Sequence, residues 1–308
     1  MLNSLYGAVE LGLLYALMSL GVYITFRILD FPDLTVDGSF VTGGGIAAIM
    51  ITQGYSPFLA GLAAFGGGAA AGACTGLLHT KGKINGLLSG ILMMIALYSI
   101  NMRIMGTPNI SLLGTDIPFF SISQAGTRIL LIAIGVILIK LLLDAFLHTD
   151  LGLALRATGD NARMIRSFGA NTDNTIILGI SLSNGLVALS GALITQQSGF
   201  ADISMGLGMI VIGLASVIIG EAIFGTRNVF FSTLAAVLGS IVYRIIVALA
   251  LRIEWLNTSD LKLITALIVI VALVLPSAQR SWRLRNVSKK RTAELAGPAS
   301  QQSVGGER

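Results

Sequence analysis

Residues 149–172, which read TDLGLALRATGDNARMIRSFGANT, form a polar, arginine-bearing island in a chain that is otherwise apolar and rich in glycine. Asp160 or Asn161 can cap the start of a helix there, because a short polar side chain accepts a hydrogen bond from a free N–H of the first turn. Gly169 suits the end of such a helix. The pattern therefore predicts a short helix over residues 162–168.

This predicted helix is amphipathic. At helical spacing Met164, Ile165 and Phe168 share one face, and Arg163 and Arg166 lie on its flanks. Such a helix can place its apolar face in a groove of another protein while the arginines meet acidic residues at the rim. The alternative is a helix that lies on the membrane surface, with its arginines among the lipid headgroups.

The composition indicates a membrane protein. The 308 residues are 54% hydrophobic and only 11% charged, whereas soluble domains carry about 25% charged residues. The formal net charge of +5 comes from basic residues between apolar runs and near the C-terminus, as in cytoplasmic flanks of membrane spans. This distribution argues against nucleic acid and for a lipid bilayer as partner.

A membrane-crossing helix needs about 20 mostly apolar residues. The segments that qualify are 4–26, 34–53, 57–79, 86–105, 128–147, 174–197, 205–224, 229–251 and 262–276. The sequence therefore predicts an all-α fold, a polytopic transmembrane helical bundle of about nine spans within one domain, residues 1–280. A basic tail over 281–308 is predicted to be disordered and cytoplasmic.

Basic residues fix the orientation, because cytoplasmic loops are enriched in lysine and arginine. Those after the first, third, fifth, seventh and ninth spans include Arg27, Lys81, Lys83, Arg156, Arg163, Arg166, Arg227 and Arg280. The opposite loops, 54–56 and 198–204, have none. The N-terminus is thus predicted outside, with loop 149–172 and the C-terminus in the cytoplasm.

Two stretches resemble each other. Residues 33–38, DLTVDG, and 202–206, DISMG, each place an acidic residue, an aliphatic residue and a hydroxyl residue before a glycine-rich apolar span. With the predicted orientation they open their spans from opposite faces, which is typical of an inverted-topology repeat. Chance similarity between glycine-rich membrane helices is the alternative.

Polar and ionisable side chains inside spans are costly and mark either functional sites or pairs between helices. Four of them are candidates for a transport pathway or gate: Glu10, Asp37, Asn184 and Arg244. The alternative for each is a structural interhelical contact.

Other charged side chains have predicted partners. Lys140 and Asp144 are four residues apart and are expected to pair on one helix. Glu221 lies near the cytoplasmic end of the seventh span, and a contact with Arg156 or Arg227 of the cytoplasmic loops is predicted.

The sequence predicts no catalytic and no metal site. It contains no nucleophile with an adjacent base and no cluster of histidine, cysteine or carboxylate at metal-ligand spacing. It also lacks the phosphate-binding pattern G-x-x-x-x-G-K-[ST]. If ATP drives this protein, a separate chain must hydrolyse it.

Taken together, three stretches resemble the permease subunits of ATP-binding-cassette (ABC) importers, in the superfamily of the branched-chain amino acid and ribose permeases. The first is G-x-x-L-R-A-x-G-x-N-x-x-M over residues 152–164, closing with Gly169. The second is the small-residue helix 208–225, in which Glu221 departs from the usual second glycine. The third is PDLTVDGSFVTGGG over 32–45, which is similar to a tryptophan-type subgroup served by lipoprotein binding proteins.

The resemblance implies a bacterial plasma or inner membrane protein that imports a small solute, with an amino acid as one candidate. It implies a permease homodimer, two ABC ATPase subunits that bind ATP and Mg²⁺, and an extracytoplasmic binding protein, with no cofactor in this chain. The loop would hold the ATPase-coupling helix. The residues carried over onto it are Arg156, Gly159, Asn161, Arg163, Met164, Ile165, Arg166, Phe168 and Gly169.

Two other classes of function remain open from the residues alone. A secondary transporter also uses repeats and broken helices, and Asp37 or Glu10 could then serve as its ion or proton site. Such a protein would not need a coupling helix. A structural or channel-forming membrane protein is the third interpretation.

Overall fold

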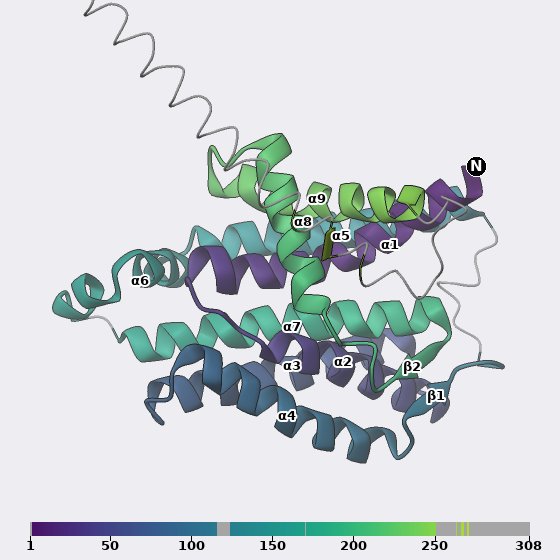
Figure 1. Ribbon diagram of the computed structural model, residues 1–308, viewed down its shortest axis with the longest axis horizontal. Helices are drawn as coiled ribbons and strands as arrows, with labels where there is room; N and C mark the ends of the chain where they lie inside the picture. The colour runs from purple at the N-terminus through teal and green to yellow at the C-terminus, as the bar shows by residue number, and fades with distance from the viewer. Residues whose placement is uncertain are drawn as a thin grey trace, which may run out of the picture.

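The computed structural model describes residues 2–115, 124–169 and 171–250, together with residues 263, 266, 267 and 270. Nearly all of these residues are helical (Figure 1). The elements in chain order are α1 (Leu2–Tyr23), the π-helix η1 (Ile24–Ile28), α2 (Thr35–Thr52), α3 (Pro57–Thr80), α4 (Gly86–Met105), β1 (Asn109–Ser111), α5 (Ala125–Leu147), α6 (Asp150–Ser167), α7 (Thr172–Ser198), β2 (Phe200–Asp202), α8 (Met209–Phe224) and α9 (Val229–Ala250).

The long helices form two layers, with α7 between them (Figure 1). One layer holds α2, α3 and α4, and the other holds α1, α5 and α9, while α8 crosses from the first layer to the second. Close packing explains the glycine-rich composition. A Cβ atom on Gly43 of α2 would lie 1.8 Å from the carbonyl oxygen of Ala188 on α7, so only glycine permits this approach.

Seven helices in the described part of the chain are long and apolar enough to cross a membrane: α1, α2, α3, α4, α5, α7 and α9. The polytopic helical bundle is therefore confirmed. The predicted span over 205–224 is wrong at its start, because residues 203–208 form turns and α8 has only 16 residues. The predicted span 262–276, apart from isolated residues, and the tail 281–308 lie outside the described residues.

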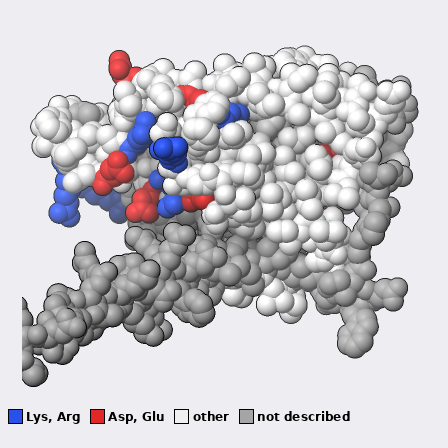
Figure 2. Space-filling model, turned by 90° about the horizontal axis from the view of Figure 1, so that it is seen from above, with Lys and Arg blue, Asp and Glu red and all other residues white. Residues whose placement is uncertain are grey.

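The two ends of the bundle differ in charge. Lysine, arginine, aspartate and glutamate gather at the end where α6 projects, and the rest of the visible face is almost uncharged (Figure 2). At the opposite end β1 and β2 pair antiparallel, with Ile110 opposite Ala201. This distribution agrees with the predicted orientation, in which the α6 end is cytoplasmic.

The two similar stretches also share a local geometry. The Asp33 carboxylate accepts the N–H of Thr35 at 2.9 Å, and the Asp202 carboxylate accepts the N–H of Ser204 at 2.7 Å. Each aspartate thus closes a turn just before α2 or α8. The shared turn supports a common origin of the two halves, while the inverted repeat itself stays a prediction.

Candidate coupling site and polar residues of the bundle

The second half of α6 is the helix predicted from the sequence. Asn161 interrupts α6 with non-helical angles (φ −158°, ψ 86°), and its side-chain oxygen accepts the N–H of Met164 at 3.1 Å. Of the two predicted caps, Asn161 is therefore the one used. The helix ends at Ser167, and Gly169 follows with a φ of +85°. The first half, residues 150–160, was not predicted as a helix; Thr149 caps it.

The apolar face of this segment is exposed. Phe168 is 78% and Met164 49% exposed, whereas Ile165 is half-buried and Arg163 exposed. The segment projects beyond the ends of the neighbouring helices (Figure 1). Phe168 and Met164 thus place apolar surface in contact with solvent at the charged end of the described chain.

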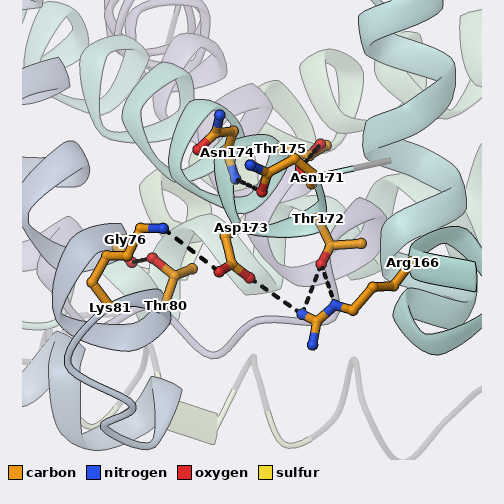
Figure 3. Close-up of polar contacts among 9 residues, drawn as sticks. All are labelled: Gly76, Thr80, Lys81, Arg166, Asn171, Thr172, Asp173, Asn174 and Thr175. Atoms are coloured by element: carbon orange, nitrogen blue, oxygen red, sulfur yellow. Dashed lines mark hydrogen bonds and ion pairs between the residues drawn. The ribbon is translucent and has the colours of Figure 1, made fainter. Parts of the chain in front are cut away.

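Arg166 is exposed but anchors the segment to α7 (Figure 3). Its guanidinium donates to the Thr172 hydroxyl at 2.8 Å and to the Asp173 carboxylate at 3.2 Å, both in the first turn of α7. The same carboxylate lies 4.0 Å from the Lys81 ammonium, which follows α3. Asp173 therefore ties α6 to α7 and to the end of α3, a role for Arg166 that the sequence did not suggest.

The first half of α6 packs against the end of η1. A Cβ atom on Gly159 would lie 1.7 Å from the carbonyl oxygen of Ile28, so the two backbones are in direct contact. Arg156, one turn earlier, is half-buried. Because Gly159 has no side chain, α6 can pack directly against η1, which follows α1.

Glu221 has a partner, but not the predicted one. Its carboxylate accepts two hydrogen bonds from the guanidinium of Arg27, at 2.8 and 2.6 Å. The predicted contact with Arg156 or Arg227 is therefore wrong. The reason is that η1 runs alongside the end of α8, so a residue far away in sequence reaches the carboxylate first. The pair joins the ends of α1 and α8 with a bidentate geometry.

Asp37 holds the start of α8. Its two carboxylate oxygens accept the N–H groups of Gly208 at 3.0 Å and Ile210 at 2.8 Å. The first N–H groups of a helix have no partner within the helix, and its N-terminal end attracts negative charge. Asp37 therefore caps a helix that begins inside the bundle, which is a structural contact between α2 and α8.

Asn184 lies at the centre of a buried polar network. It donates to the Asp33 carboxylate at 2.6 Å and accepts from the Ser39 hydroxyl at 2.7 Å, and it is fully buried. Thr35 bonds Thr75 of α3 at 2.8 Å beside it. The network fixes the start of α2 against α3 and α7, and no sequence pattern indicated Asp33 as its acceptor.

Glu10 and Lys140 are each paired. The Glu10 carboxylate on α1 lies 2.7 Å from the Arg128 guanidinium on α5. The Lys140 ammonium lies 2.5 Å from the Asp144 carboxylate, which confirms the predicted pair. Asp144 also accepts from the Thr233 hydroxyl of α9 at 2.7 Å. Both ion pairs hold α5 in its layer.

Arg244 differs from these residues. Its guanidinium carbon lies 3.7 Å from the ring centre of Tyr15 on α1, and its buried Nε has no hydrogen-bond partner among the described residues. No salt bridge joins it to a carboxylate of the described chain. No group of three histidine, cysteine or carboxylate side chains suited to a metal ion occurs in the described ranges.

The chain is similar to known transport proteins. The sequence profile of the family described as "Branched-chain amino acid transport system / permease component" matches residues 5–274. A tyrosine transport system permease protein of Clostridioides difficile (strain R20291) is 43% identical over 89% of this chain and 92% of its own length.

More distant relatives extend the comparison. An uncharacterized protein of Rickettsia prowazekii (strain Madrid E) is 37% identical over 88% of this chain and 97% of its own length. A ribose import permease protein of Escherichia coli (strain K12) is 26% identical over 62% of this chain and 61% of its own. No solved structure gives a significant match.

Proposed function

Because this chain belongs to the family of branched-chain amino acid transport system permease components, a multi-pass permease family of ABC importers, we propose that it imports an amino acid with energy from separate ATPase subunits. In this proposal the chain itself hydrolyses nothing and holds no cofactor. ATP and Mg²⁺ bind to the partner, which agrees with the missing phosphate-binding pattern in this sequence.

The observation that carries the proposal is the second half of α6. Its exposed Phe168 and Met164 stand on a helix that Asn161 caps and Arg166 anchors. An amphipathic helix of this kind can insert its apolar residues into a groove of the ATPase, with Arg163 at the rim. Since the helix is held by contacts to η1 and α7, a displacement of the ATPase would reach the bundle.

The remaining parts of the proposal rest on the relatives. The similarity to a tyrosine transport permease supports an amino acid as cargo. Two copies of the chain and two ATPase subunits would form the transporter in the membrane. An extracytoplasmic binding protein, of the lipoprotein type in the resembled subgroup, would deliver the cargo at the end that carries β1 and β2.

The secondary-transporter interpretation has lost its support from the geometry. Glu10 is paired with Arg128, and both oxygens of Asp37 are engaged by the start of α8. Neither carboxylate can exchange an ion or proton without breaking one of these contacts. A secondary transporter, in contrast, would not need the anchored helix α6.

The test is docking of the ATPase. Phe168→Asp and Met164→Asp should leave the permease folded, and co-purification with the cognate ATPase should fall at least tenfold, because burial of a charge against an apolar groove costs at least about 1.4 kcal/mol. Phe58→Asp is the matched control, since Phe58 is 76% exposed at the opposite end of the bundle. Normal ATPase binding and ATP-driven uptake in both α6 variants would contradict the proposal, as would uptake driven by an ion gradient without any ATPase.

A further inference from the structure

Arg244 is the exception among the charged side chains inside the described bundle. Glu10 and Arg128 form one ion pair and Lys140 and Asp144 another, and Asp37 binds the backbone of α8. Arg244, in the second half of α9, has only the ring of Tyr15 and no carboxylate among the described residues.

The position of Arg244 is at the depth where α8 begins. Tyr243 of α9 lies in a buried cluster with Ala215 and Ile219 of α8, and Ile212, near the first residue of α8, packs against this cluster. On the other side, Tyr15 stacks on Phe40 of α2 with ring centres 6.1 Å apart. Arg244 of α9 thus contacts α1 through Tyr15, and Tyr15 in turn packs on Phe40 of α2.

The charged groups described around Arg244 do not neutralise its guanidinium. The N-terminal end of α8 carries partial positive charge. Asp37 lies one turn before Phe40, but both of its carboxylate oxygens bind the backbone at the start of α8. A cation–π contact is worth about 0.5–2 kcal/mol, much less than the several kcal/mol needed to desolvate an ion. Within the described part of the chain this arginine has no carboxylate partner, so it is a candidate group for binding an anion.

The chemistry of the side chain defines the anion. The guanidinium is planar, always charged and presents parallel N–H groups that match a carboxylate in bidentate fashion. Tyr15 is 6% exposed and covers one face of the guanidinium, while Arg244 itself is half-buried, so part of its surface is left uncovered. A ligand with a small carboxylate can thus approach the edge of the fork.

We propose that Arg244 binds the α-carboxylate of the transported amino acid on its way through the bundle, with Tyr15 as the residue that positions the guanidinium. This inference rests on the proposed function for the nature of the cargo. It adds that the pathway passes α9 and that the translocating cargo must carry a carboxylate.

The first measurement is uptake of the cargo amino acid by the complete transporter in proteoliposomes. Arg244→Gln should reduce uptake at least tenfold while ATPase binding is retained, and Arg244→Lys should restore part of it, because lysine keeps the charge and the ring contact but not the fork. Arg103→Gln, an exposed arginine at the end of α4, is the matched control and should transport normally. Wild-type uptake in Arg244→Gln, or no recovery in Arg244→Lys, would overturn the proposal.

The second measurement needs neither ATP nor a partner. Ala248 lies one turn after Arg244 and is half-buried; Ala248→Cys is made with Cys74→Ser, since Cys74 is exposed. With Arg244 present, an anionic methanethiosulfonate reagent should label the cysteine several-fold faster than a cationic one. This ratio should fall to about one in Arg244→Gln. Equal ratios in both proteins would refute an anion site even if ATP-driven import is established, and a lost preference would support the site even if import is not.

Discussion

Replacement of Gly159 by alanine tests how α6 is seated. The new Cβ atom would lie 1.7 Å from the carbonyl oxygen of Ile28 and 3.0 Å from the Cα of Leu29. Because the obstacle is backbone, no side-chain rotation relieves the clash. The helix must retreat by about 1.3 Å to restore a 3.0 Å contact, and overpacking of this kind costs about 1–3 kcal/mol.

Alanine also stabilises a helix by about 1 kcal/mol relative to glycine. The measured effect is therefore the overpacking cost minus this gain in helix propensity. Because the obstacle is backbone, we take the overpacking cost from the upper part of its range, about 2–3 kcal/mol, and expect a net loss of about 1–2 kcal/mol in the free energy that holds α6 on η1. Amide hydrogens in residues 150–160 should then exchange roughly 5- to 30-fold faster. The amount of ATPase that co-purifies with this variant should fall, because the docking segment is no longer held in a fixed position.

Gly66→Ala is the matched control for Gly159→Ala. A Cβ atom on Gly66, within α3, would meet no heavy atom within 4 Å. This variant gains helix propensity without a clash, so exchange in α6 should be unchanged. If Gly159→Ala exchanged as slowly as the wild type and bound ATPase equally well, the direct contact between α6 and η1 would be refuted.

Two further predictions concern other charged groups. Lys140→Met leaves the Asp144 carboxylate buried without its cation and should lower the free energy of unfolding by about 3–5 kcal/mol, measured by thermal unfolding in detergent. The double variant with Asp144→Leu should recover most of this loss. A second loss that adds to the first would contradict the pairing. The Ser204 hydroxyl and N–H hold the pKa of the Asp202 carboxyl below its usual value, so its contribution to stability is present above about pH 4 and is lost as the pH falls through the lowered pKa. The stability difference between wild type and Asp202→Asn should therefore shrink on acidification below about pH 4, and a constant difference would refute this interpretation.

The sequence predicted the parts of the fold that local physics determines. Apolar runs of sufficient length became α1 to α5, α7 and α9 within a few residues of the expected bounds. The cap at Asn161 and the glycine at 169 follow from residue type alone. The pair of Lys140 and Asp144 was predictable because both lie on one helix at a fixed spacing.

Contacts between distant segments were beyond local rules. Glu221 binds Arg27, 194 residues away, because η1 and α8 end side by side. The N-terminal shortening of α8 depends on Asp37, whose carboxylate replaces the missing turn of the helix. Asp33 became the acceptor for Asn184 only when α2 and α7 packed together. Each of these contacts requires knowledge of which helices are neighbours.

The break at Asn161 divides α6 between the two layers of the bundle. Before the break, Gly159 seats on Ile28 at the end of the α1 layer. After it, Arg166 is tied through Asp173 to α7 and to Lys81 beside α3. A force applied at Phe168 would therefore rotate the second half of α6 about Asn161 rather than move it along the helix axis. In the proposed function, this rotation would change the angle between the layers, and α8, which crosses from one layer to the other, would turn with it.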